Sequence, residues 1–458
     1  MSNSLSRRDM LVGGSRALLA GACLPTLRGF HNIGEAALAS LGSAPPPDYR
    51  ALVCVFLEGG NDSFNMIVPR DATGHAIYQV SRGGMAVARN SLLAITPQSG
   101  ADTRQWGFHP SAPGLRDLFE AGHLSILANV GTLLAPMTKQ QFVNNTVPKP
   151  AQLFSHSDQS TLWQLPSARD DVQHGWAGRM SDLLLPMNNG ALLSPAISMA
   201  GSARLLRGQT VVPYTMSAEG SIALTGTWGA DGTRRFQTLR QLFANAQPQV
   251  MQREIANLQE QAITLDGTIR SSLAAAPALA TQFPSTNLAQ QLRMVARMIS
   301  AREGLGAGRQ VYFVRQGGYD THANQLGNHP ALLAELSGAL VAFQAAMAEL
   351  GVNSQVTTCT MSEFGRTLTS NANGSDHGWG GHQMIMGGSV QGRRIYGTMP
   401  NLALNGPDDS GLGRIIPTTA VDQYAATMAK WFGVSAGSMS SLFPRLSQFA
   451  TADLGFLV

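Results

Sequence analysis

The stretch Ala51-Leu-Val-Cys-Val-Phe-Leu57 is wholly apolar and is followed at once by Glu58-Gly59-Gly60-Asn61-Asp62. A short apolar run closed by glycines is typical of a central parallel strand that helices cover on both faces. Three other apolar runs have the same character, at residues 124–130, 310–315 and 355–361. We therefore predict that four buried strands build one sheet.

Helical patterns separate these strands. Residues 330–350 carry leucine, phenylalanine and methionine at helical spacing, and residues 115–121, 250–265 and 288–299 are also predicted helices. Alternation of strands and helices predicts an α/β fold with a doubly wound, mostly parallel sheet flanked by helices. Residues 185–247 break this alternation with short strand-like pieces, and we interpret them as an inserted cap region.

The N-terminus has the pattern of a twin-arginine (Tat) signal peptide. Arg7 and Arg8 precede a weakly apolar stretch, residues 10–27, that is rich in Gly and Ala. A membrane anchor is the alternative, but it needs about 20 apolar residues with few charges, and Arg16 interrupts this stretch. We predict export in the folded state to the periplasm or the extracellular space, with the Tat translocase as partner and no stable membrane anchor.

The predicted signal peptide ends at residue 39. Ala37-Leu38-Ala39 has the small-x-small form that signal peptidase needs, which leaves residues 40–458 as the mature domain. Cys23 offers lipid attachment as an alternative. Cys54 and Cys359 lie in predicted strands, where a free cysteine acts as a small apolar side chain. They can form a bridge if their strands are neighbours, but three cysteines make no disulfide framework.

Composition limits the class of protein. The 458 residues are 44% hydrophobic and 13% charged, which suits one large α/β domain. The formal charge is +4, and four arginines against Asp9 and Glu35 give residues 1–39 a charge of +2, leaving +2 for the mature chain. Without a run of Lys or Arg, no nucleic-acid partner is expected.

Acidic and histidine residues follow the predicted strands where each strand ends. Asp62 follows the first strand, Asp320 and His322 follow residues 310–315, and Glu363 follows residues 355–361. A loop then supplies further polar side chains: Asn371, Asn373, Ser375, Asp376, His377 and His382. Ligands of open parallel sheets bind beyond the carboxyl ends of the strands. Carboxylates and imidazoles together are ligands for Zn²⁺, Mn²⁺ or Fe, and two such ions would clamp a phosphoryl or sulfuryl group.

Each of these residues also has a purely structural interpretation. Asp62 suits a turn after two glycines, Asp320 suits a helix N-cap, and Asp376 suits a loop turn. Glu363 is in reach of an ion pair with Arg366. Other chemistries lack their motifs, since the sequence contains no G-x-S-x-G, P-loop, G-x-G-x-x-G or H-E-x-x-H pattern.

Several motifs together resemble one family. They are the leader, Phe56-Leu-Glu-Gly-Gly-Asn-Asp62, Phe154-Ser-His-Ser-Asp-Gln159, Gly317-Gly-Tyr-Asp-Thr-His322, Ser362-Glu-Phe-Gly-Arg366 and Ser375-Asp-His-Gly378. In order and spacing they resemble the Tat-exported proteins called domain of unknown function 1501. That family looks like a distant branch of the alkaline phosphatase–sulfatase superfamily. The resemblance implies metal-assisted hydrolysis of phosphate or sulfate esters by a doubly wound α/β domain.

The resemblance also implies roles for single residues. Asp62, Asp376 and His377 resemble the ligands of a first metal ion. Asp320 and His322 resemble ligands of a second ion, with His382 as a possible third ligand and Glu363 on the same rim. The spacing Asp-x-His departs here from the superfamily's Asp-x-x-x-His. The expected cofactor is a divalent metal: Zn, Mn, Mg or Ca.

The nucleophile is expected at a helix N-terminus. Ser155 is the candidate, with His156 beside it as a catalytic residue and Ser157 as second choice. The alternative is a serine that only caps the following helix. A formylglycine motif is absent. The leading hypothesis is an exported metal-dependent hydrolase of phosphate or sulfate esters, and the alternative is a non-catalytic envelope binding or accessory protein that retains the fold.

Overall fold

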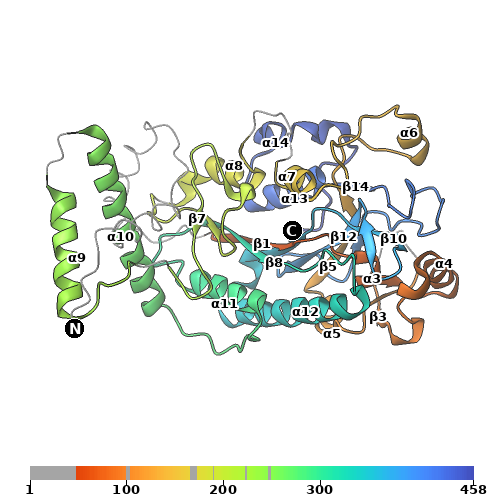
Figure 1. Cartoon of the computed structure of the whole chain (residues 1–458), viewed down its shortest axis with the longest axis horizontal. Helices are drawn as coiled ribbons and strands as arrows, with labels where there is room; N and C mark the ends of the chain where they lie inside the picture. Colours follow the sequence, from red (N-terminus) through yellow and green to blue (C-terminus); the bar gives the residue numbers. More distant parts are fainter. Residues whose placement is uncertain (1–47, 99–103, 166–172, 189, 222–223, 246–248) are drawn as a thin grey trace.

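A large central sheet forms the middle of the molecule (Figure 1). The computed structural model describes residues 48–98, 104–165, 173–188, 190–221, 224–245 and 249–458. The predicted signal peptide, its cleavage site and Cys23 lie outside the described residues.

The sheet has nine strands in the order β13-β5-β12-β9-β1-β8-β6-β7, with β14 beside β5. Strand β1 is parallel to β8 and β9, while β12 runs antiparallel to both β5 and β9. The strands are β1 (Arg50–Leu57), β5 (Leu124–Gly131), β6 (Ala196–Ser198), β7 (Tyr214–Thr215), β8 (Arg309–Gln316), β9 (Val356–Met361), β12 (Gly381–Gly387), β13 (Ile395–Tyr396) and β14 (Thr419–Ala420). The predicted mostly parallel α/β sheet is confirmed, with β12 as an antiparallel member.

Helices cover both faces of this sheet (Figure 1). On one face lie α5 (Pro113–Glu120), α11 (Asn287–Ser300) and α12 (Gln325–Glu349), and on the other α7 (His156–Gln164), α8 (Trp176–Leu183), α13 (Val421–Phe432) and α14 (Ala436–Leu442). Side chains of a strand alternate between the faces. Accordingly Val53 and Val55 of β1 join one core cluster, while Leu52 and Cys54 join the other. The continuous apolar run therefore reflects burial on both sides.

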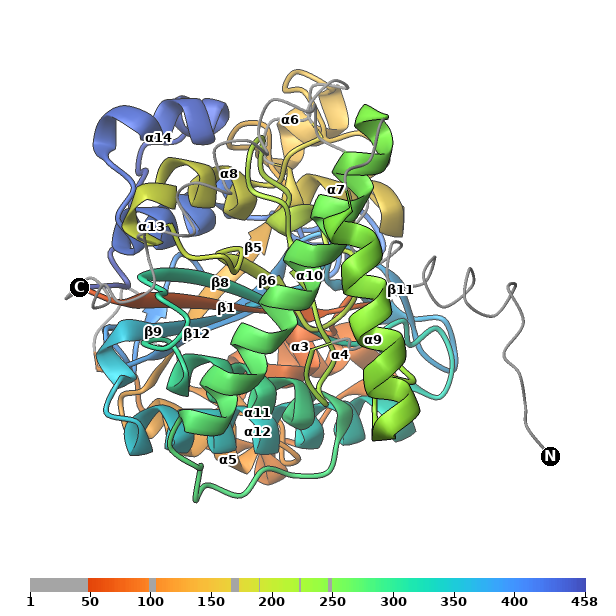
Figure 2. The same ribbon diagram turned by 90° about the vertical axis from the view of Figure 1, so that its left-hand side faces the viewer.

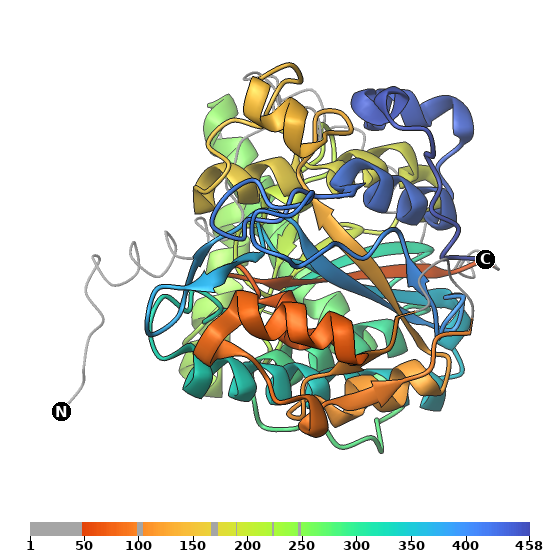
Figure 3. The same ribbon diagram turned by 90° about the vertical axis from the view of Figure 1, so that its right-hand side faces the viewer.

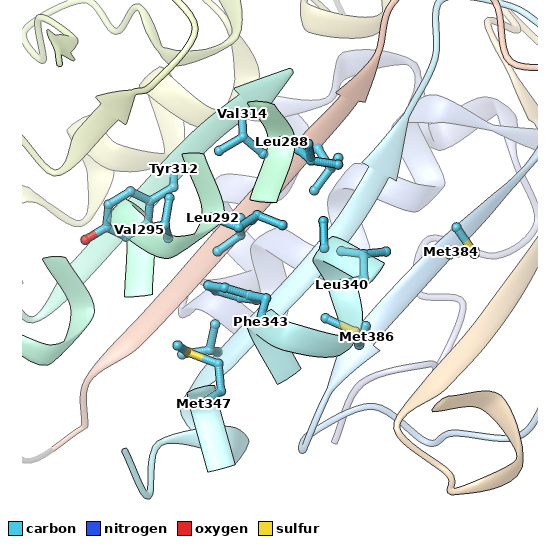
Figure 4. Close-up of a cluster of buried hydrophobic side chains, with 14 of the residues drawn as sticks. Leu288, Leu292, Val295, Tyr312, Val314, Leu340, Phe343, Met347, Met384 and Met386 are labelled. Carbon is cyan, nitrogen blue, oxygen red and sulfur yellow. The ribbon is translucent and has the colours of Figure 1, made fainter. Parts of the chain in front are cut away.

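Figure 4 shows the core beneath α11 and α12. Leu292 of α11 and Phe343 of α12 are fully buried and point toward the sheet, where they meet residues such as Val314 of β8. Helix α12 begins at Gln325, so Pro330 lies inside it rather than at its start. Among the described helices α12 is the one long and apolar enough to span a bilayer, but more than half of its apolar window is buried inside the protein.

The range predicted to be an insertion contributes to the sheet edge and then leaves it. Strands β6 and β7 extend the sheet beyond β8. Helix α9 (Gly229–Ala244) follows and contacts α10 (Val250–Ala275), which is longer than the predicted helix 250–265. The two helices stand side by side at this end of the molecule (Figure 2).

The opposite end carries smaller elements. A three-stranded antiparallel sheet is formed by β2 (Ile67–Pro69), β4 (Trp106–Phe108) and β3 (Leu93–Ile95), and a hairpin by β10 (Arg366–Ser370) and β11 (Ser375–His377). Helix α4 (Ala72–Arg82) contacts β10, and Figure 3 shows it in orange-red in front of the sheet. Strands β1, β8 and β9 share one direction, and Leu57 lies in register with Gln316. Their carboxyl ends, and the loops that follow, therefore meet on one edge.

Candidate metal centre

The loops after β1, β8 and β9 approach one another through a glycine. Gly59 has φ +116°, and a Cβ atom on it would lie 2.2 Å from the backbone nitrogen of Asp320. Its own N–H donates to Glu363 Oε1 at 2.9 Å. Only a residue without a side chain permits this close approach of backbones. Gly59 thus fixes Asp320 and Glu363 relative to each other.

Three histidines and one aspartate meet beyond these loops, and we call His156, Asp320, His322 and His377 the His–Asp cluster. One ligand atom from each of His156, Asp320 and His377 lies within 4.8 Å of the others. His322 Nε2 is 2.9 Å from His377 Nε2 and 3.1 Å from Asp320 Oδ1. His156 begins α7, His377 ends β11, and the other two precede α12. Separate elements thus deliver one compact group.

The second nitrogen of each imidazole faces an oxygen acceptor. The Nδ1 atom lies 2.9 Å from Glu363 Oε1 in His156, 3.0 Å from Asp376 Oδ1 in His322, and 2.7 Å from the Phe154 carbonyl in His377. Carbonyls and ionised carboxylates only accept hydrogen bonds, so each Nδ1 carries the proton. In a neutral imidazole the Nε2 atom then has a free lone pair. Three such lone pairs face the carboxylate of Asp320.

The surrounding charges shift the protonation of these groups. The hydrogen bond to Glu363 raises the pKa of His156. Burial lowers the pKa of His377. Partial burial opposes ionisation of Asp320, but Arg366 and the imidazoles outweigh it, and its pKa is lowered. The hydrogen bond from Asn371 lowers the pKa of Asp376. Both carboxyl groups are therefore ionised at neutral pH.

Arg366 backs the cluster from the protein interior. Its Nη2 atom donates to Asp320 Oδ1 at 3.0 Å, and its side chain is fully buried. The alternative of a Glu363–Arg366 pair is not what the structure has, because Glu363 Oε1 is taken by His156 and Gly59. The other carboxylate oxygen of Glu363 is buried without a hydrogen-bond partner among the described residues. Asp320 is about half exposed, at 47%, so the cluster opens to solvent.

Two of the predicted metal ligands have other partners. Asp62 was predicted to share a metal ion with Asp376 and His377. It is fully buried, and its partners are Arg82 and Gln325. His382 is buried too, and its Nδ1 atom accepts from the Asn129 N–H at 3.1 Å. Burial lowers the pKa of His382 to about 3, so this imidazole is neutral. Glu363 and Asp376 contact the Nδ1 atoms of His156 and His322, and not the Nε2 atoms that face Asp320.

The serine candidates lie next to the cluster in sequence. Ser155 is the N-cap of α7, and its hydroxyl donates to Asp158 Oδ2 at 2.5 Å. Ser157 is exposed and donates more weakly to the same oxygen at 3.2 Å. Ser155 makes no side-chain capping hydrogen bond to a backbone N–H of α7. Its contact with Asp158 is one through which a carboxylate accepts a serine proton.

Sequence reasoning did not assign His156, Arg82 and Gln325 the contacts that they make. His156 was predicted as a catalytic residue beside the serine and not as a metal ligand, because its place in the cluster depends on how α7 docks. Gln325 bonds Asp62 and also accepts from Ser375 Oγ at 2.5 Å, which joins α12 to the hairpin. Such contacts join residues far apart in sequence, and no local pattern signals them.

The donor set of the cluster fits a divalent metal ion. Imidazole nitrogens and a carboxylate oxygen are ordinary ligands of such ions. Ligating histidines characteristically donate their other N–H to a carboxylate or a backbone carbonyl, and all three imidazoles here do so. Lone pairs that face each other across 2.9 Å repel unless a cation or a proton lies between them.

Comparison with solved structures gives distant similarities. They include a sulfatase from a Pseudoalteromonas species, with 10% identity, TM-score 0.33, and coverage of 90% of this chain and 72% of that one. A protein in the alkaline phosphatase superfamily from Vibrio parahaemolyticus has 10% identity, TM-score 0.35, and coverage of 94% and 76%. A lipoteichoic acid synthase from Listeria monocytogenes has 8% identity, TM-score 0.32, and coverage of 89% and 78%.

Comparison with curated protein sequences gives no match. A family model does match, over residues 49–410, which is most of the chain and includes every residue of the His–Asp cluster. The resemblance drawn from the motifs is thereby confirmed. The chain belongs to the family described as protein of unknown function DUF1501.

Proposed function

We propose that this protein is an exported, metal-dependent hydrolase of phosphate or sulfate esters. The observation that carries the proposal is the convergence of three imidazole Nε2 atoms on Asp320, each with its Nδ1 atom bound to an oxygen acceptor. His156, Asp320, His322 and His377 would hold the ion. A divalent ion bound there supplies Lewis-acid polarisation of an ester oxygen and charge neutralisation.

The chain's own groups would carry the remaining chemistry. Ser155 would attack the phosphorus or sulfur, so that its Oγ forms a bond as the bond to the ester oxygen breaks, and its proton would pass to Asp158 and then to the departing oxygen, which leaves as the alcohol. Water would then hydrolyse the serine ester and restore the hydroxyl. The hydrogen bond from Ser155 to Asp158 supports this assignment, because a free serine hydroxyl is a poor nucleophile at neutral pH.

Two variants separate the roles of ligand and nucleophile. Asp320→Asn removes an anionic ligand, so metal content and turnover of an aryl phosphate or sulfate should both fall. Ser155→Ala should lower turnover by at least about 100-fold while metal content stays intact. His123→Asn is the control, because it removes an imidazole that is not part of the cluster. Elemental analysis and a chromogenic assay measure the two quantities.

Other results would redirect the assignment. If Ser157→Ala loses turnover and Ser155→Ala does not, the nucleophile is Ser157. If the wild-type protein, loaded in turn with Zn²⁺, Mn²⁺, Mg²⁺ and Ca²⁺, cleaves no ester in a broad phosphate and sulfate panel, the hydrolase proposal fails. A non-catalytic envelope binding protein that retains the fold would then be the better hypothesis.

A further inference from the structure

We infer that the His–Asp cluster takes a single ion of the zinc class, and that Asp62 is not one of its ligands. The inference rests on the proposed function, because it specifies the metal of the same site. It departs from the arrangement that the family resemblance implies, in which Asp62 belongs to the shell of one of two ions.

The donor atoms suffice for one ion. His156, Asp320 and His377 each place one ligand atom within 4.8 Å of the others. His322 Nε2 joins them at 2.9 Å from His377 Nε2 and 3.1 Å from Asp320 Oδ1, an oxygen that also accepts from Arg366. One oxygen of each nearby carboxylate already accepts hydrogen bonds, while Glu363 Oε2 is buried without a hydrogen-bond partner among the described residues. Glu363 Oε1 accepts from His156 and Gly59, and Asp376 Oδ1 accepts from His322 and Asn371. Four ligands match the tetrahedral shell that zinc prefers.

The charges also favour one ion over two. The groups in contact with the cluster include three carboxylates, those of Asp320, Glu363 and Asp376, and two guanidiniums, those of Arg366 and of Arg414, which donates to the His377 carbonyl at 3.1 Å. With neutral imidazoles this leaves one negative charge, which a single divalent cation already outweighs. A second dication would add uncompensated positive charge close to a fully buried guanidinium, where the low dielectric strengthens repulsion.

Asp62 binds a cation and an amide donor through one of its two carboxylate oxygens, whereas its Oδ1 atom is buried without a hydrogen-bond partner among the described residues. Its Oδ2 atom binds both Arg82 and Gln325, and the side chains of Asp62 and Arg82 are fully buried. Arg82 in turn donates to the Thr367 carbonyl at 2.7 Å and to Asn65 Oδ1 at 3.0 Å. Removing Asp62 from this ion pair to coordinate a metal would leave a buried guanidinium without its counter-ion, which is strongly unfavourable.

The ligand types select the class of metal. Imidazole suits Zn²⁺, Co²⁺ and related ions, whereas Mg²⁺ and Ca²⁺ prefer carboxylates, carbonyls and water. Three of the four donors here are nitrogen atoms. Zn²⁺ and Co²⁺ should therefore bind the metal-free protein at least about 100-fold more tightly than Mg²⁺ or Ca²⁺.

The test is titration of the mature exported chain after removal of metal with a chelator. Zn²⁺ binding is followed by calorimetry, and Co²⁺ binding by the visible absorption of the tetrahedral ion. We expect one equivalent of either metal. His322→Ala and His377→Ala should each weaken binding at least tenfold. The paired variant Asp62→Asn, Arg82→Gln, which removes both charges together, should keep one equivalent.

X-ray absorption of the zinc-loaded wild type covers the case in which the paired variant does not fold. It should show imidazole scattering and no neighbouring zinc at the ~3.5–4 Å of two-metal sites. Two equivalents, a zinc–zinc distance, loss of binding in the paired variant, or tighter binding of Mg²⁺ would each overturn the inference. Ester turnover with two ions would leave the hydrolase proposal intact. One zinc ion without turnover of any ester would leave the inference standing and remove the hydrolase.

Discussion

At the scale of single residues, two features separate the histidines of the His–Asp cluster from those of the protein interior. They are the partner of the second ring nitrogen and the depth of burial. Burial lowers the pKa to about 4 in His109 and His329 and to about 3 in His382, so these imidazoles remain neutral inside the protein. His156 is half-buried, and its hydrogen bond to Glu363 raises its pKa instead. Residue type alone cannot tell these two sets apart, and His382 was a predicted ligand for that reason.

Gly59 offers a prediction at the same scale. An alanine there must adopt φ +116°, and its Cβ atom would lie 2.2 Å from the Asp320 nitrogen. Gly59→Ala should therefore displace Asp320 and lower zinc affinity at least tenfold. Gly122→Ala is a matched control, because Gly122 also has positive φ, +80°, but a Cβ atom on it meets nothing within 4 Å. The control should lose roughly 1–2 kcal/mol of stability at unchanged affinity. Equal affinities in calorimetry would contradict the role of Gly59.

At the scale of elements, the sequence predicted those strands that a local pattern of apolar residues encodes. The strands at Ala51, Leu124 and Gln310 were placed within a residue or two, since each is a continuous apolar run covered on both faces. Because β1, β8 and β9 are parallel, their ends share an edge, and Asp320, His322 and Glu363 follow from that rule. The antiparallel pairing of β12 and the docking of α7 depend on contacts between distant segments, so neither was predicted.

Helix α13 carries a testable electrostatic feature. Burial raises the pKa of Asp422 to about 7, and its Oδ1 atom has no partner among the described residues. The folded state therefore binds a proton that the unfolded state releases near pH 4, so this group lowers stability as the pH rises from about 4 to about 7. Asp422→Asn should raise the free energy of unfolding at pH 8 by up to about 4 kcal/mol, at about 1.4 kcal/mol per pKa unit, and much less at pH 4.5.

Urea unfolding at both pH values measures this effect. Asp231→Asn is the matched control, because Asp231 also lies in the first turn of a helix, α9, but its side chain is 83% exposed. It should change stability little at either pH. If the free energy of unfolding rises as steeply between pH 4.5 and 8 in the wild type as in Asp422→Asn, then Asp422 is not the source of the pH dependence.

At the scale of the whole molecule, the sheet joins the two thiols of the described chain. Cys54 of β1 and Cys359 of β9 lie in register on neighbouring strands, with their sulfur atoms 3.7 Å apart. Both are fully buried between the sheet and its helices. The neighbouring thiol and burial raise the pKa of Cys54 well above its usual range, so the thiolate that reacts with oxidants is scarce. We therefore expect folding to protect this pair from oxidation.

This protection makes the route of export measurable, because disulfides form in oxidising compartments. A chain folded in the cytoplasm and exported by the Tat route should arrive with Cys54 and Cys359 still reduced. After denaturation without reductant, maleimide labelling should count two thiols, and Cys54→Ser should count one. Replacing residues 1–39 by a Sec-type leader exports the chain unfolded, and a disulfide-linked fraction should then appear. Changing Arg7 and Arg8 to lysine should leave precursor inside the cell. Normal secretion of that variant, or a disulfide in the wild-type exported protein, would contradict folded export.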